Sequence, residues 1–176
     1  MGTLKLDRSN TDPLKTRLRK ISEQWQDEAG ESVLYILSRD QRIADNHALI
    51  AAQKHAMQLG LPLAVVFVCN TVTADRALEH YQFMLTGLLE LEADLALHNI
   101  PLIGLVGDKA QTLGAVFHHL KPAVVYADFS PLRGSMTVLE KLAQERPVVV
   151  VDTHNIVPVW VASPKQEFAA RTLRPK

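Results

Sequence analysis

Side chains that could bind a small ligand follow three of the apolar runs in the sequence. One run is followed by Ser38-Arg39-Asp40, a second ends in Val68-Cys69-Asn70, and a third is followed by Asp128-Phe129-Ser130. Carboxylates accept hydrogen bonds from polar ligand groups, and an arginine pairs with anions or stacks on planar rings. Beside apolar neighbours, these residue types indicate a binding pocket rather than a catalytic centre.

The spacing of the remaining reactive residues indicates neither catalysis nor a metal site. No G-x-G-x-x-G or Walker-type phosphate loop follows any apolar run, and no serine or cysteine lies in a recognisable nucleophile elbow. His118 and His119 are adjacent, so on a helix they point about 100° apart. Asp152 and His154 have no further ligands near them in sequence, and His154 is expected to bond to backbone. We therefore predict no catalytic residue and no metal ligand.

Five apolar runs in the sequence predict five buried strands, and these strands must position the ligand-binding side chains. The apolar runs are continuous rather than alternating, which is typical of strands covered on both faces. Helical patterns lie between them, so the fold class is expected to be α/β, a doubly wound five-stranded parallel sheet flanked by helices. Ligands bind such sheets beyond the carboxyl ends of the strands. The expected strands are Val33–Leu37, Leu63–Val68, Leu102–Val106, Ala123–Tyr126 and Val148–Val151.

Capping residues predict where three of the helices begin. Asp45 is a candidate N-cap, Asp108 with Gln111 resembles a capping box, and Ser130-Pro131 reads as a cap followed by a first turn. Residues 1–32 are expected to form an N-terminal extension with a short amphipathic helix, whose apolar positions are Leu14, Leu18, Ile21 and Trp25.

Composition and charge place the chain among ordinary globular domains. Its 176 residues carry no net charge and are 47% hydrophobic, which suits one domain with its own core. The only cysteine, Cys69, excludes an internal disulfide and is expected to be an inert buried side chain. Residues 1–24 contain no apolar core of a secretory signal, and the apolar runs are of strand length. We therefore expect a cytoplasmic protein without a membrane span.

Basic side chains concentrate at the two ends of the sequence. Residues 1–20 hold six basic and two acidic side chains, and residues 163–176 hold four basic and one acidic. The middle of the chain is therefore acidic and is a poor binder of phosphate. Any contact of this chain with nucleic acid would have to come from its ends.

Four segments resemble the DNA photolyases, in the form found in class II cyclobutane pyrimidine dimer enzymes. They are SRDQRIADNHALIAAQ, HYQFMLTGLLELEADL, ADFSPLRGSM and DTHNIVPVWVASPKQEFAARTLRPK. The resemblance runs in order from about Val33 to Lys176. It implies an N-terminal α/β antenna domain over residues 33–162 with strand order 3-2-1-4-5, followed at 163–176 by the start of a linker.

The resemblance also implies a cofactor and a set of binding residues. Photolyases hold an antenna chromophore near these strand ends, and for class II enzymes we expect 8-hydroxy-5-deazaflavin. Asp40 or Asp128 would accept hydrogen bonds from the ring or its ribityl hydroxyls, and Arg39 would stack on or pair with the anionic ring. The expected cofactor-binding residues are Arg39, Asp40, Val68, Cys69, Asp128, Phe129 and Ser130.

In the family the linker leads to a helical domain that holds FAD, binds the lesion and performs the light-driven repair. That domain is not in this sequence, so it is the expected partner, in cis or as a separate chain, and DNA would be contacted only through it. The 176-residue chain is expected not to repair thymine dimers by itself. Without the partner's cover, the Ile156–Trp160 stretch is expected to be exposed and to favour self-association.

Other interpretations of the same residues remain open. Arg39 and Asp40 could pair with each other, Asp128 could cap the helix that follows it, and Phe129 could belong to the core. At the level of the protein, one alternative is a free-standing α/β domain that binds an adenine nucleotide or flavin-like ligand. Another is an interaction module without a ligand. Deazaflavin binding would separate these from the antenna domain.

Overall fold

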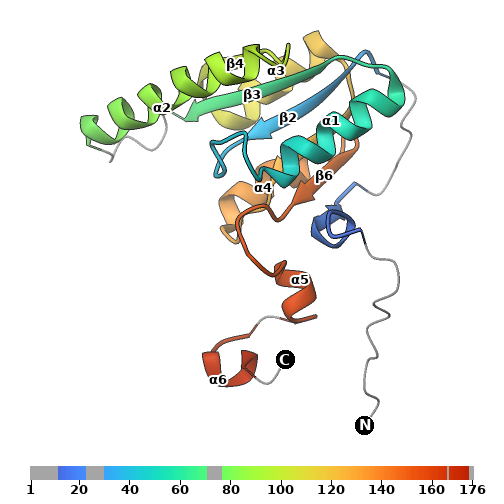
Figure 1. The fold of residues 1–176 in the computed structure, drawn as a ribbon, viewed down its shortest axis with the longest axis vertical. Coiled ribbons are helices and arrows are strands. Elements are labelled where there is room, and N and C mark those ends of the chain that lie inside the picture. Colours follow the sequence, from blue (N-terminus) through green and yellow to red (C-terminus); the bar gives the residue numbers. More distant parts are fainter. Residues whose placement is uncertain (1–11, 23–29, 71–76, 166, 175–176) are drawn as a thin grey trace.

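A mostly parallel sheet covered by helices on both faces forms the centre of the molecule (Figure 1). The computed structural model describes residues 12–22, 30–70, 77–165 and 167–174 of the 176-residue chain. In these ranges the sheet has six strands in the order β1-β6-β5-β2-β3-β4. The strands are β1 (Leu18–Lys20), β2 (Ser32–Leu37), β3 (Leu63–Asn70), β4 (Leu102–Gly107), β5 (Pro122–Asp128) and β6 (Val148–Val151).

Two hydrophobic clusters fill the space between the sheet and its helices. On one face β2, β3 and β5 pack against helices α1 (His47–Leu59) and α2 (Leu78–Ala96). On the other face they pack against α3 (Lys109–Leu120) and α4 (Arg133–Leu142). Short helices α5 (Val159–Ala162) and α6 (Ala170–Leu173) follow the last strand. All six residues of β2 and all seven of β5 are buried, because these strands lie in the middle of the sheet.

The expected order of the five parallel strands is confirmed. The predicted order 3-2-1-4-5 corresponds to β4-β3-β2-β5-β6, with parallel pairing at each step. The chain therefore reverses its direction of winding between β2 and β5. The loops after these two strands leave the sheet side by side at its carboxyl edge, which is where such folds bind ligands.

The amphipathic helix expected around Leu14–Trp25 is wrong for the part that the structure describes. Lys15–Arg17 form a single 3-10 turn, and Leu18–Lys20 form the sixth strand, β1, which pairs antiparallel with β6. Trp25 lies outside the described residues. Two of the three residues of β1 are charged, as is common in edge strands, and a three-residue strand is too short to show a period of two.

Two of the three predicted helix starts need correction. Asn46, not Asp45, caps α1, since its side chain accepts a hydrogen bond from the Leu49 amide at 2.9 Å. Helix α4 begins at Arg133, and Ser130 accepts a hydrogen bond from the Leu132 amide before the helix starts. Asp108 caps α3 as predicted, accepting from the Gln111 amide at 2.9 Å.

No helix in the described ranges combines the length and the apolar content that crossing a bilayer requires.

Candidate functional site

The carboxylate of Asp128, at the end of β5, organises the loop that follows β2. Its Oδ2 accepts hydrogen bonds from the backbone amides of Ser38 and Arg39, each at 2.8 Å, and of Asp40 at 3.3 Å. Its Oδ1 accepts from the Tyr35 hydroxyl at 2.7 Å. The alternative in which Asp128 caps the following helix is therefore wrong. This buried carboxylate joins the two strand ends at the switch point and holds the loop between them.

Tyr35 is the buried partner of this carboxylate. Burial raises the pKa of Tyr35 well above its ordinary value, and the negative charge of Asp128 raises it further. The Asn46 side-chain amide donates to the same hydroxyl at 3.0 Å and also to the backbone oxygens of Asp40 and Arg42. Sequence reasoning missed Tyr35 and Asn46, because a tyrosine inside an apolar run and an asparagine before a helix both have ordinary structural explanations.

Asp40 is buried to 1% exposure, yet only one of its two carboxylate oxygens has a hydrogen-bond partner among the described residues. Oδ1 accepts a hydrogen bond from the Arg42 guanidinium at 2.6 Å and lies 3.4 Å from Nδ1 of His154. Oδ2 has no hydrogen-bond partner among the described residues. The alternative pairing with Arg39 is wrong, since Arg42 takes that place. A buried acceptor without a donor is costly, so a ligand N–H or O–H at this oxygen would stabilise it.

Arg39 and Phe129 lie next to each other at the same edge. The exposed Arg39 guanidinium donates to the Phe129 carbonyl at 3.4 Å. The Phe129 ring is half-buried and meets Trp160 edge to face, with ring centroids 5.3 Å apart. The structure thus brings Arg39, Asp40, Asp128 and Phe129 together, with a charged group that ligands can reach beside an aromatic wall.

The other predicted site residues do not share one wall. Val68 packs into the cluster under α3 and α4, whereas Cys69 packs toward α1 and α2, because successive side chains of β3 point to opposite faces. Ser130 is buried and its hydroxyl accepts from the Leu132 amide at 3.3 Å. A pocket on one face of the sheet can therefore be lined by Val68 or by Cys69, but not by both.

Lys109 is a further charged residue at this edge that the sequence analysis passed over. It is the first residue of α3, directly after its cap Asp108, and its side chain is half-buried. Burial lowers the pKa of Lys109, while the nearby charge of Asp128 acts in the opposite direction. A lysine immediately after a strand end is the sequence signal that could have identified it.

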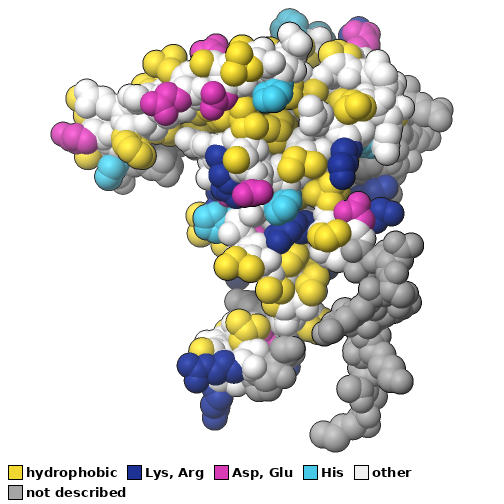
Figure 2. Space-filling view, in the orientation of Figure 1, with side chains coloured by type: hydrophobic (Ala, Val, Ile, Leu, Met, Phe, Trp, Pro, Cys, Tyr) yellow, Lys and Arg dark blue, Asp and Glu magenta, His cyan; other side chains and the backbone are white. Residues whose placement is uncertain are grey.

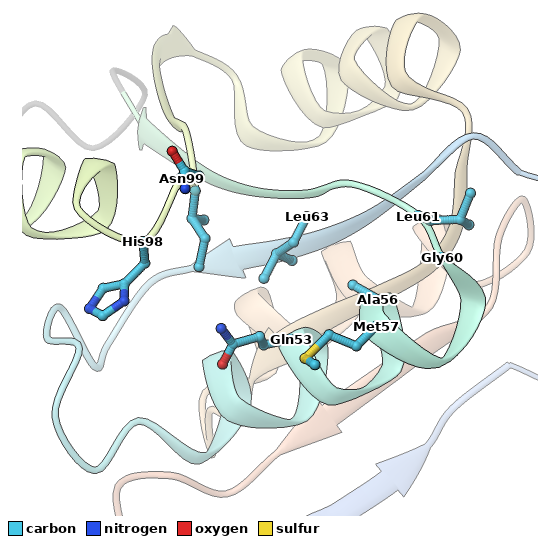
Figure 3. A pocket seen from close by; sticks show the side chains of 9 residues that line it. Gln53, Ala56, Met57, Gly60, Leu61, Leu63, His98 and Asn99 are labelled. Carbon is cyan, nitrogen blue, oxygen red and sulfur yellow. The ribbon is translucent and has the colours of Figure 1, made fainter.

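The hollow in Figure 3 lies near the amino ends of the strands, opposite to the strand ends that carry the predicted site. It measures about 250 Å³ and is lined by residues near the amino end of β3, including Gln53, Gly60, Leu63 and His98. None of the predicted site residues contributes to it. Among the described residues, no three His, Cys, Asp or Glu side chains gather closely enough to hold a metal ion.

The fold and the strand-end cluster define a doubly wound α/β domain with a candidate ligand site at its switch point. The family model described as "DNA photolyase" matches residues 33–176. The chain is 39% identical over 92% of its length to the deoxyribodipyrimidine photo-lyase of Potorous tridactylus, and 36% identical over 90% to that of Arabidopsis thaliana. It is 29% identical over 91% to the enzyme of Methanothermobacter thermautotrophicus.

The chain therefore belongs to the DNA photolyase family. It spans about a third of the length of these relatives, namely 31%, 33% and 36% of them.

Proposed function

We propose that this chain is the N-terminal antenna domain of a class II-type photolyase that repairs cyclobutane pyrimidine dimers in DNA. The observation that carries the proposal is the family match over residues 33–176 together with coverage of only about a third of each relative. In this proposal the domain harvests light and docks to a FAD-binding helical domain, through which DNA is bound. A cytoplasmic location is part of the proposal and is supported by the single cysteine.

The residues at the switch point fit the proposed chromophore, 8-hydroxy-5-deazaflavin. Asp40 offers a buried oxygen that accepts no hydrogen bond in the described structure, which suits a ring N–H or a ribityl hydroxyl. The Arg39 guanidinium is exposed above this edge and can pair with an anionic ring, and Phe129 provides an aromatic surface. Asp128 already accepts hydrogen bonds from three backbone amides, so we assign it to holding the loop rather than to ligand contact.

Ligand binding to the purified 176-residue chain tests this proposal. We expect 8-hydroxy-5-deazaflavin to bind with micromolar or better affinity. Fluorescence anisotropy of the deazaflavin measures this binding. Asp40→Asn should weaken binding about tenfold or more, because one lost charge-assisted hydrogen bond is worth at least about 1.4 kcal/mol. Asp45→Asn is the matched control, since Asp45 is exposed in the same loop and asparagine tolerates its positive φ of 53°.

The outcomes separate the candidate functions. Equal loss of affinity in the Asp45→Asn control would place the chromophore elsewhere. Binding of ATP but not of the deazaflavin would favour a nucleotide-binding domain. If neither ligand binds to the folded chain, the interaction module without a ligand is the better explanation. Repair of thymine dimers by this chain alone, with added FAD under blue light, would contradict the proposed division of labour.

A further inference from the structure

Helix α2 exposes apolar side chains on a face that points away from the sheet core. Its buried face is formed by Leu88, Leu91 and Leu95. Phe83 and Leu97, on an adjoining face, are 86% and 81% exposed. Positions spaced by three or four residues share a helix face. Phe83 and Leu97 therefore lie on the same face of α2 as three acidic residues and one glycine. That face consists of Glu79, Phe83, Gly87, Glu90, Asp94 and Leu97.

The part of this face from Gly87 to Leu97 forms one wall of a groove. A hollow of about 460 Å³ separates it from the loop that follows β2. Gln41, Arg42, Ile43 and Ala44 line the loop side, and Gly87, Glu90, Leu91, Asp94, Leu97 and His98 line the helix side. We call this the α2 groove. Ile43 and Leu91 give it an apolar floor, and the space beside Gly87 is open, since a Cβ built there meets no atom within 4 Å.

The groove is acidic on its helix wall. Between Leu78 and Ala96 the helix carries four acidic side chains and no lysine or arginine. Figure 2 shows acidic side chains along α2 above hydrophobic ones. The one arginine on the loop wall, Arg42, is paired with Asp40 at 2.6 Å. Packing α2 against the α2 of a second copy would bring like charges together, which disfavours self-pairing through this face.

We propose that the α2 groove binds an amphipathic helix of a partner protein that carries lysine or arginine along one side of an apolar stripe. Helices commonly bind to proteins by laying their apolar face into such a groove. Gly87 and Leu97 on the helix wall are 10 residues apart in the sequence, which corresponds to about 15 Å along a helix or about three turns. The basic side of the partner would face Glu90 and Asp94, and its apolar stripe would contact Ile43 and Leu91.

Two designed peptides test the proposal on the 176-residue chain. Both are four-turn helices with leucines at positions i, i+4, i+7 and i+11. One has lysines along one side of the leucine stripe, and the other has glutamates in their place. Fluorescence anisotropy is expected to show saturable binding of the lysine peptide and none of the glutamate peptide. The affinity should fall as salt is raised, because the flanking contacts are exposed ion pairs.

Charge reversal on the groove wall gives the decisive comparison. Glu90→Lys combined with Asp94→Lys should weaken binding of the lysine peptide by about tenfold or more and create binding of the glutamate peptide. The matched control is Glu92→Lys, which adds a lysine on a different face of α2. Leu97→Ser, which removes an apolar side chain from the groove wall, should weaken both interactions. These residues are exposed, so the fold is expected to survive each change.

Three outcomes would overturn the proposal. The first is equal binding of both peptides, and the second is an equal effect of Glu92→Lys. The third is a dimer of the chain that Leu97→Ser dissociates in analytical ultracentrifugation, which would assign the groove to a second copy. The proposal is independent of the strand-end ligand, since none of these changes touches Asp40 or Arg39.

Discussion

At the scale of single residues, the Asp128 carboxylate accepts hydrogen bonds from Tyr35, Ser38, Arg39 and Asp40, so we expect it to contribute strongly to stability. Replacing it by alanine would leave the buried Tyr35 hydroxyl and the part-buried amides of Ser38 and Arg39 without this acceptor. We expect Asp128→Ala to lower the free energy of unfolding by about 2–4 kcal/mol. Urea denaturation measures this change.

Asp108→Ala is the control for Asp128. Asp108 is an exposed helix cap with one hydrogen bond from the Gln111 amide, so its loss should cost about 1 kcal/mol. A change of similar size in the two variants would show that the hydrogen bonds around Asp128 add little to stability.

Tyr35 provides a pH-dependent test of the same network. Its pKa is raised in the folded chain, chiefly by burial and then by Asp128, whereas in the unfolded chain it is about 10. The unfolded state therefore loses its proton first as the pH rises. The stabilisation that comes from Tyr35 is complete below pH 10 and is lost progressively as the pH rises above that value.

The measurement is urea denaturation of the wild-type chain and of Tyr35→Phe between neutral pH and the alkaline range. Because phenylalanine cannot ionise, the loss of stability above pH 10 should be shallower in the variant. Parallel curves for the two proteins would mean that Tyr35 does not contribute to the alkaline transition.

At the scale of elements, the N-terminal segment fastens the chain that follows β6. The Arg17 guanidinium donates to three carbonyl oxygens, those of Asp152 at 2.9 Å, Asn155 at 2.7 Å and Ile156 at 2.8 Å. The Trp160 indole N–H donates to the Thr16 carbonyl, and the Arg19 guanidinium lies 5.8 Å from the Trp160 ring centroid. The segment around Arg17 was predicted from the sequence to belong to an N-terminal extension. In the structure it is instead bonded to the chain after β6 at the edge of the sheet.

Arg17→Ala tests this fastening. We expect the free energy of unfolding to fall by about 2 kcal/mol, since hydrogen bonds from a charged donor are lost from three carbonyls. Limited proteolysis with chymotrypsin should also cut faster at Trp160. Lys15→Ala is the control, because Lys15 is exposed in the same segment. Unchanged proteolysis in Arg17→Ala would mean that β1 pairing alone holds the segment.

At the scale of the whole molecule, the chain after β6 presents an apolar surface. Ile156 is 94% exposed, and Val157, Val159 and Val161 are also exposed. The whole Ile156–Trp160 stretch was expected to be exposed, but the Trp160 ring is half-buried against Phe129. We propose that a partner domain covers this surface in the longer protein.

If the surface is left uncovered, the 176-residue chain should associate with itself as its concentration rises. Sedimentation velocity over a wide concentration range measures this, and the double variant Ile156→Ser with Val157→Ser should shift the chain toward monomer. The Phe83→Ser variant serves as the control, since it removes an apolar side chain from α2 instead. A monodisperse wild-type monomer at all concentrations would contradict the prediction.

The sequence by itself determined the sheet and the place of the candidate site. Continuous runs such as Val148–Val151 mark strands buried on both faces, and the residues that follow parallel strands necessarily meet at one edge. The order of the five strands followed from the family resemblance, and Asp108 was identifiable as a cap because capping depends on local chemistry.

Only the tertiary structure decided how those residues are used. Asp40 and Asp128 are both buried carboxylates after strands. Asp40 retains one oxygen with no hydrogen-bond partner in the part of the chain that the structure describes, whereas Asp128 accepts from backbone amides that precede it by about 90 positions. Likewise, Leu18–Lys20 become a strand only because β6 offers them an unpaired edge. Contacts between distant segments leave no local periodicity, so residue types and spacing could not reveal them.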